Sequence, residues 1–299
     1  ADKLNMSMGG GVGEEDEDED PEDYQDKILQ AMERRKMGKN ASYFAFTATP
    51  KKATLEKFGT KNEKGGFDPF HLYSMKQAIE EGFILDVLAN YSTYRSYYEV
   101  QKSVQDNPSF DTQKAQKKLR AYVEAHQQTI ESKAAQMAEH FLGQVVATKK
   151  LRGQARGMVV TRNIVCAIRY FFALRAELVA AKAPFQAIIA FSGKKKVDGI
   201  EYTEESINGF PTKDIPDKLA GDTKSGEPTY KLLVVANKFL TGFDEPLLHT
   251  MYVDKRLQGV VAVQALSRLN RCNAKMQKQD TCVLDFYNTA AEIKDAFDP

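Results

Sequence analysis

Five short apolar runs, rich in Val, Ile and Leu, recur through the second half of the chain. They span residues 157–161, 185–191, 231–236, 249–254 and 281–285. Runs of this kind are typical of strands buried on both faces, which occur in parallel sheets. A segment with helical apolar spacing lies between the first two runs and another precedes the last, so the pattern predicts an α/β fold with a parallel sheet.

Two polar motifs follow these runs. Residues 241–246 read Thr-Gly-Phe-Asp-Glu-Pro, and residues 264–271 read Gln-Ala-Leu-Ser-Arg-Leu-Asn-Arg. Their context predicts that Thr241 to Asp244 form a loop at the carboxyl end of a strand, the edge of an open sheet where ligands collect.

Gln264, Arg268 and Arg271 are separated by four and then three residues, which would place them on one face of a helix. Two guanidinium groups with fixed donors suit a polyanion such as a triphosphate. An isolated Arg-x-x-Arg is more often a solvated surface pair, but here it follows a predicted sheet and loop.

The same residues resemble a known family. Thr-Gly-Phe-Asp-x-Pro followed by Gln-x-x-Ser-Arg-x-Asn-Arg resembles motifs V and VI of superfamily 2 helicases and translocases, and residues 46–50, Phe-Thr-Ala-Thr-Pro, resemble motif III. Residues 73–87 and 240–250 are similar to the motor (R) subunit of type I restriction enzymes. Ser267 stands where motif VI commonly has glycine, and restriction-type motors tolerate serine there.

The resemblance implies an RecA-like architecture. Residues 1–100 would be the C-terminal part of a first RecA-like lobe that carries motif III, residues 101–143 a helical linker, and residues 144–299 a second RecA-like lobe with motifs IV to VI. A short buried strand over residues 42–46 would deliver motif III.

It also implies roles for individual residues. Gln264, Arg268 and Arg271 would face the ATP phosphates, with Arg271 as the arginine finger, and Gly242 and Asp244 would lie near the nucleotide or the arginine helix. Residues that couple the nucleotide state to lobe movement would be Thr47, Ala48, Thr49 and Pro50. Candidate contacts to the DNA backbone are Thr241, Thr161, Ser192 and Arg156, although turn capping or a solvated surface explains several of them equally well.

Several expected parts of such a motor are not found in these residues. No Gly-x-x-x-x-Gly-Lys-Ser/Thr phosphate loop and no Asp-Glu-x-His occur, so the ligands of Mg²⁺ would lie upstream. We expect the chain to be a piece that begins shortly after motif II and to be inactive alone. The Cys and His spacing predicts no metal site among these residues.

Composition limits the function less than the motifs do. The net charge is +1, which carries no nucleic-acid signature by itself. Residues 14–20 are seven consecutive acids and predict an exposed segment. Without an apolar signal region or a long apolar run, the sequence predicts a cytoplasmic protein with no membrane partner.

Three functions remain open from the sequence. The leading one is part of an ATP-dependent double-stranded DNA translocase in a type I restriction endonuclease, working with its methyltransferase (M) and specificity (S) subunits. A generic superfamily 2 helicase or type III restriction motor is the second. The third, from another class, is a non-catalytic module that docks on the other subunits. Such a module would not need three phosphate-binding side chains together.

Overall fold

The structure is a computed structural model, and it describes residues 44–47, 50, 52–94, 127–221 and 229–297. The chain divides into two compact units, Ala1–Leu72 and Tyr73–Pro299. The described part of the first unit holds α3 (Lys52–Phe58) and the antiparallel pair β1 (Thr60–Lys61) and β2 (Phe67–Asp68).

The predicted buried strand over residues 42–46 is wrong for its described part. Residues 44–47 form no strand, and the Phe44 and Phe46 side chains are 81% and 95% exposed. A strand is buried only where neighbouring strands and side chains cover it.

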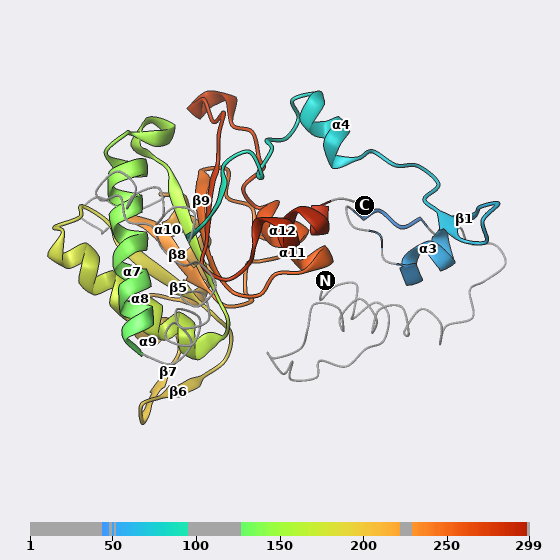
Figure 1. The fold of residues 1–299 in the computed structure, drawn as a ribbon. Helices are drawn as coiled ribbons and strands as arrows, with labels where there is room; N and C mark the ends of the chain where they lie inside the picture. The colour runs from blue at the N-terminus through green and yellow to red at the C-terminus, as the bar shows by residue number, and fades with distance from the viewer. Residues whose placement is uncertain (1–43, 48–49, 51, 95–126, 222–228, 298–299) are drawn as a thin grey trace, which may run out of the picture. The chain divides into compact units, whose positions relative to one another are not determined.

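The second unit is built on a six-stranded parallel sheet, shown in Figure 1. Its order across the sheet is β3 (Tyr91–Thr93), β10 (Cys282–Asp285), β9 (Leu248–Asp254), β4 (Arg156–Thr161), β8 (Tyr230–Val235) and β5 (Gln186–Ala190). Every neighbouring pair is parallel. The four central strands have almost no exposed residue, as the apolar runs predicted.

Helices cover both faces of this sheet. On one face, α7 (Gln127–His140) and α8 (Ile164–Ala180) enclose an apolar core with Val159, Ile189 and Val234. On the other, α10 (Ile215–Ala220), α11 (Gly259–Leu266) and α12 (Ala290–Phe297) pack over Met158, Val160 and neighbouring strand residues. This three-layer arrangement confirms the predicted RecA-like α/β fold.

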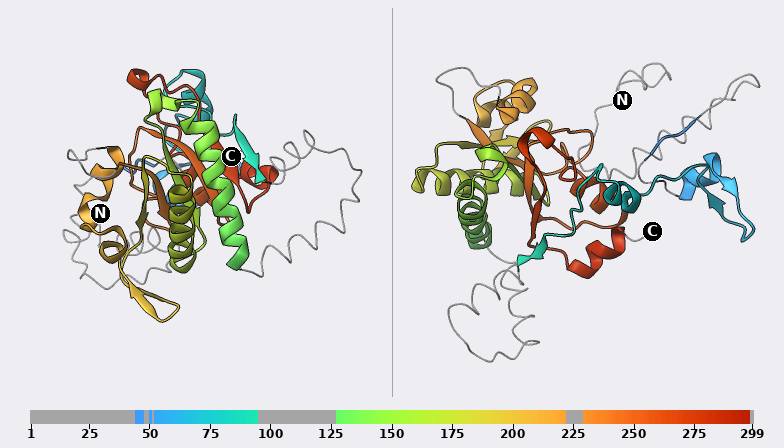
Figure 2. Two further views of the ribbon diagram at one scale, coloured as in Figure 1. Left: turned by 90° about the vertical axis from the view of Figure 1, so that its left-hand side faces the viewer. Right: turned by 90° about the horizontal axis from the view of Figure 1, so that it is seen from above.

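The stretch from residue 193 to residue 221 holds several short elements. It forms a hairpin of β6 (Lys195–Val197) and β7 (Ile200–Tyr202), which projects beyond the end of the sheet in Figure 1 and in the left view of Figure 2. Helix α9 (Glu204–Asn208) comes next, and the Thr203 side chain caps it. A 3-10 turn (Thr212–Asp214) and α10 follow.

Segments before residue 144 also contribute to this unit. Strand β3, which lies in the predicted first lobe, pairs with β10, and the Tyr94 ring stacks on Phe286 at 5.0 Å. Helix α7, from the predicted linker, packs against α8. The three-part division at residues 100 and 143 stays a prediction. No helix among the described residues is long and apolar enough to cross a membrane.

Close packing where β4 begins gives a first testable prediction. A Cβ atom at Gly157 would lie 2.7 Å from Leu232 Cδ2 and 3.0 Å from Phe141 Cε2, both in fully buried side chains. Gly157→Ala should therefore destabilise the unit by about 1–3 kcal/mol through overpacking, measured by hydrogen exchange of β4 and β8 amides. Gly143→Ala is the matched control, since a Cβ there meets nothing within 4 Å; equal exchange in both variants would contradict the prediction.

Candidate functional site

The two polar motifs meet at the amino edge of the sheet, where its parallel strands begin. Residues 236–247, the crossing loop, carry the chain from the carboxyl end of β8 to the amino end of β9, where the Leu247 carbonyl accepts a hydrogen bond from the Arg156 amide at 2.9 Å. Helix α11 then returns from the carboxyl end of β9 and delivers residues 267–272, the arginine loop, to the same edge. The prediction that Asp244 lies at the carboxyl edge is therefore wrong, because a connection between parallel strands must cross the whole sheet.

The helix that carries the arginine motif ends earlier than predicted. It ends at Leu266 with Ser267 as its C-cap, so Gln264 is helical while Arg268 and Arg271 lie in the turn that follows. The prediction of one shared helical face is wrong for the two arginines. Leu269, which lies in this turn, is fully buried.

Arg268 joins the two motifs through backbone carbonyls. Its Nη1 donates to the Phe243 carbonyl at 2.9 Å and its Nε donates to the Gln264 carbonyl at 3.2 Å. Partial burial, followed by the neighbouring Arg271, lowers the pKa of Arg268, while Asp244 opposes the shift. Since an arginine remains charged even so, Arg268 fixes the crossing loop with a permanent cation.

Arg271 and Asp244 form an ion pair across the two loops. Arg271 Nε lies 3.2 Å from Asp244 Oδ1, and both side chains are about half exposed. Gly242, two residues before Asp244, has φ +70°, a left-handed conformation that favours glycine. The exposed pair is weak in water, so a phosphate could replace the carboxylate as the partner of Arg271.

A segment far away in sequence supports the arginine loop from outside. The Leu85 amide donates to the Asn270 carbonyl at 2.8 Å, and Ile84 forms an antiparallel bridge with Arg271. This segment follows α4 (Met75–Glu80), which Ser74 caps. The part of the sequence that resembles R subunits before residue 88 thus contacts the arginine motif directly.

Relatives of known name cover most of this chain. The HindI endonuclease subunit of a type I restriction enzyme from Haemophilus influenzae is 26% identical over 274 residues, which are 86% of this chain and 24% of that protein. A protein named as the type I MjaIXP endonuclease subunit of Methanocaldococcus jannaschii is 27% identical, over 88% of this chain and 24% of its own length. Residues 196–288, which contain both motifs, match the model of type I restriction enzyme subunit R domain 3.

The chain is similar to type I restriction enzyme endonuclease subunits over most of its length, and to subunit R domain 3 over residues 196–288. It spans about a quarter of the length of these two relatives. Among solved structures, a fragment described as the HsdR subunit of a type I restriction enzyme from Vibrio vulnificus aligns over 79% of this chain and 38% of its own, with a TM-score of 0.47 and 14% identity.

Two of the predicted DNA contacts are buried. Thr161 is fully buried, and its hydroxyl donates to the Val235 carbonyl at 3.1 Å, so it ties β4 to β8. Arg156 is 5% exposed, and its Nε donates to the Leu219 carbonyl at 2.6 Å. Neither side chain faces solvent, and both predictions are corrected to structural roles. Sequence alone could not show this, because residues at strand ends occur both buried and exposed.

The other two predicted DNA contacts are exposed. Ser192 follows β5 at the carboxyl edge, and Thr241 lies within the crossing loop. Of the predicted coupling residues, Thr47 is exposed and Pro50 half-buried, whereas Ala48 and Thr49 lie outside the described residues. The predicted acidic segment 14–20 also lies outside them.

Buried charged residues around the motifs were missed from the sequence. At the amino edge, Lys278 is 4% exposed and donates to the Leu269 carbonyl at 2.9 Å, and Glu245 is 5% exposed and accepts from the Leu247 amide. At the carboxyl edge, the Glu204 carboxylate accepts from the Phe191 amide and from Lys238 Nζ. Glu245 lies within a sequence motif, which was its only signal in the sequence. Lys278 and Glu204 are charged residues in polar stretches, and such a sequence gives no sign that they are buried.

The arginine loop fits an anionic phosphate chain in charge and exposure. Arg271 presents a half-exposed guanidinium. Two donors of the Arg268 guanidinium are already bonded to backbone carbonyls. Gln264 is half-buried one turn earlier. Within the described ranges, no group of three or more His, Cys, Asp or Glu side chains could hold a metal ion.

Proposed function

We propose that this chain is part of the ATP-dependent DNA translocase motor of a type I restriction enzyme R subunit. It would supply motif III, V and VI residues to ATP hydrolysis that is coupled to movement along double-stranded DNA before cleavage. The complete enzyme would be an ATP-dependent site-specific deoxyribonuclease acting in the cytoplasm.

One observation carries this proposal: the ion pair between Arg271 and Asp244 joins motif VI to motif V at 3.2 Å, with Arg268 bonded to the neighbouring Phe243 carbonyl. Phosphoryl transfer spreads negative charge over the transferred group, and a correctly placed arginine stabilises that charge. Arg271 would turn from Asp244 to the phosphates when ATP is bound, while Arg268 keeps the crossing loop in place.

The bound ATP would supply the phosphoryl group, and Mg²⁺ would be held by residues upstream of this chain. The residues described here would bind and orient the phosphates from one side only. Gln264 would add an uncharged donor, and Gly242 would allow the backbone to turn close to the nucleotide. Thr47, Ala48, Thr49 and Pro50 would transmit the nucleotide state from the first lobe.

The same crossing loop would connect ATP to DNA. It begins at the carboxyl edge of the sheet and ends at the amino edge beside the arginine loop. Thr241 is exposed within it, and Ser192 is exposed at the carboxyl edge, so either hydroxyl could hold a DNA phosphate. Any shift of Asp244 on ATP binding would therefore move Thr241 as well. The M and S subunits would be the protein partners.

ATP-driven displacement of a DNA triplex by the full-length R subunit, assembled with its M and S subunits, tests this proposal. Displacement should need ATP and a long duplex, and the duplex strands should not separate. Strand separation would favour a generic helicase instead. ATP turnover that is absent, or that DNA does not stimulate, would favour a docking module and contradict the motor proposal.

A further inference from the structure

A buried lysine lies beneath the junction of the two motifs and belongs to neither. Lys278 is 4% exposed, and its Nζ donates to the Leu269 carbonyl at 2.9 Å. Leu269 is fully buried and stands between the two arginines of the arginine loop. The Lys278 backbone is itself held, because its amide donates to the Asn273 carbonyl at 3.0 Å.

Burial of the Lys278 ammonium group costs free energy. Among the residues that the structure describes, no carboxylate forms an ion pair with it, although Glu245 and Asp244 are near enough to stabilise its charge. Burial is the largest effect and lowers the pKa of Lys278 to about 8; Cys272, Glu245 and Asp244 oppose that shift, and Arg271 adds to it. His249 is the other titratable group close to Lys278.

A buried charge without an ion pair does not serve stability, since an apolar side chain of similar volume is often as stable or more so. The ammonium is aimed at the carbonyl of the turn from which both arginines extend. The position of Lys278 therefore suits a role in orienting the Arg268 and Arg271 guanidinium groups better than a role in stabilising the core.

We propose that Lys278 is a positioning residue for the arginine loop. Its ammonium holds the Leu269 carbonyl and so sets where Arg268 and Arg271 stand relative to Phe243 and Asp244. This inference rests on the proposed function, because its effect is on ATP hydrolysis. A misplacement of about 1 Å in a catalytic group can cost roughly a hundredfold in rate, so loss of one such hydrogen bond should be measurable.

Lys278→Met and Lys278→Arg in the full-length R subunit, within its complex, test the proposal. Lys278→Met should lower the kcat for ATP by about tenfold or more and change KM much less, while the melting temperature stays within a few degrees of wild type because a buried charge is removed. Lys278→Arg keeps a charged donor and should restore part of the lost kcat.

The pH dependence gives a second readout. As pH rises through about 8, Lys278 loses its proton and kcat should fall in the wild type but not in either variant. Stability should change in the opposite direction. The pKa of Lys278 in the folded protein lies below its ordinary value of 10.5. The buried charge therefore lowers the free energy of unfolding by its full amount below pH 8 or so, and this loss shrinks as pH rises toward 10.5. Wild type should therefore gain stability relative to Lys278→Met over that range.

The outcomes separate the two claims. A wild-type complex that does not hydrolyse ATP would contradict the proposed function itself. With an active wild type, Lys278→Met turnover equal to wild type would overturn the inference. A large loss of melting temperature that Lys278→Arg fails to correct would also overturn it, since Lys278 would then serve only the fold.

Discussion

Arg271→Ala in the full-length R subunit is expected to abolish ATP hydrolysis, with a loss of about a thousandfold or more, the range found for arginine fingers in phosphoryl transfer. The reason is geometric. Arg271 offers a half-exposed guanidinium that is ion-paired with the similarly exposed Asp244, so the guanidinium is available to a phosphate at little cost. DNA binding should remain largely intact, because the exposed candidates for DNA contact are other residues.

Arg175→Ala is the matched control, because Arg175 is exposed on α8, on the face of the sheet opposite α11. It should leave turnover unchanged. Steady-state ATP hydrolysis and DNA affinity measured on the same preparations separate a catalytic defect from a folding defect. Turnover by Arg271→Ala within a few-fold of wild type would refute the finger assignment.

Asp254→Ala should produce the largest loss of stability. Asp254 is 1% exposed at the carboxyl end of β9, where Oδ1 lies 2.6 Å from Lys133 Nζ and Oδ2 accepts from the Tyr170 hydroxyl at 2.9 Å. The carboxylate thereby joins α7 and α8 to the sheet. Burial raises the pKa of Tyr170, and the nearby Asp254 carboxylate raises it further. Removing it leaves the Lys133 ammonium buried without a partner, which costs about 3–5 kcal/mol.

Hydrogen exchange of β9 and α7 peptides in the full-length subunit measures this effect. A loss of that size corresponds to faster exchange by roughly a hundredfold or more, at about 1.4 kcal/mol per tenfold. The double variant Lys133→Met with Asp254→Leu removes both charges and should be less damaged than Asp254→Ala. Equal protection in Asp254→Ala and wild type would contradict the prediction.

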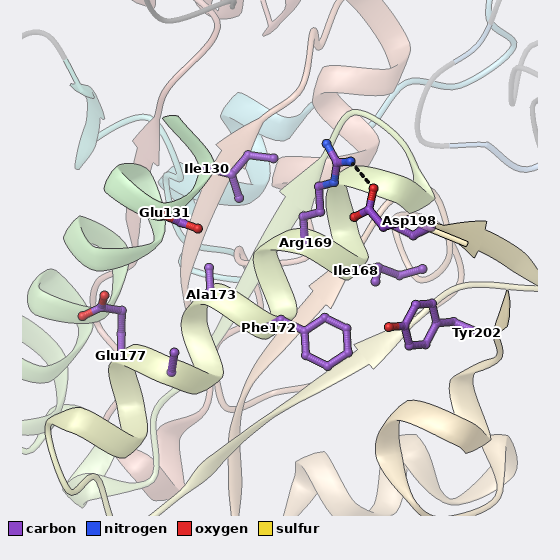
Figure 3. A pocket seen from close by; sticks show the side chains of 11 residues that line it. Ile130, Glu131, Ile168, Arg169, Phe172, Ala173, Glu177, Asp198 and Tyr202 are labelled. Atoms are coloured by element: carbon purple, nitrogen blue, oxygen red, sulfur yellow. Dashed lines mark hydrogen bonds and ion pairs between the residues drawn. The ribbon is translucent and has the colours of Figure 1, made fainter. Parts of the chain in front are cut away.

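A groove on the α7 and α8 side of the sheet is separate from the arginine loop. It has a volume of about 490 Å³ and is lined by residues such as Ile130, Phe172 and Tyr202, with Arg169 donating to Asp198 at 3.1 Å, as Figure 3 shows. It lies far in the fold from both motifs, since α11 and the crossing loop pack on the other face. The proposed function therefore makes no use of it.

Much of the sheet could be predicted from sequence because burial on both faces leaves a clear pattern. The runs at 157–161 and 231–236 became β4 and β8 within a residue of their expected bounds. Strand β3 was harder to place, since Tyr91–Thr93 is short and lies at the edge of the sheet, and its partner β10 follows almost two hundred residues later.

The site was predicted in composition but not in geometry. Spacing placed Arg268 and Arg271 on a helix, whereas both lie in the turn after α11, which ends at Leu266. The edge of the sheet was misplaced because the loop after β8 is a full crossover, which local sequence does not reveal. Lys278 was missed because burial of a single charge depends on tertiary contacts.

As an arginine finger, Arg271 should stabilise the transferred phosphoryl group rather than ground-state ATP. The affinity of the full-length R subunit for ADP, with and without aluminium fluoride, tests this most directly, because such a complex imitates the transition state. The wild type should bind ADP much more tightly when fluoride is present, and Arg271→Ala should lose that gain while binding ADP alone as before. An equal gain in both proteins would contradict the claim.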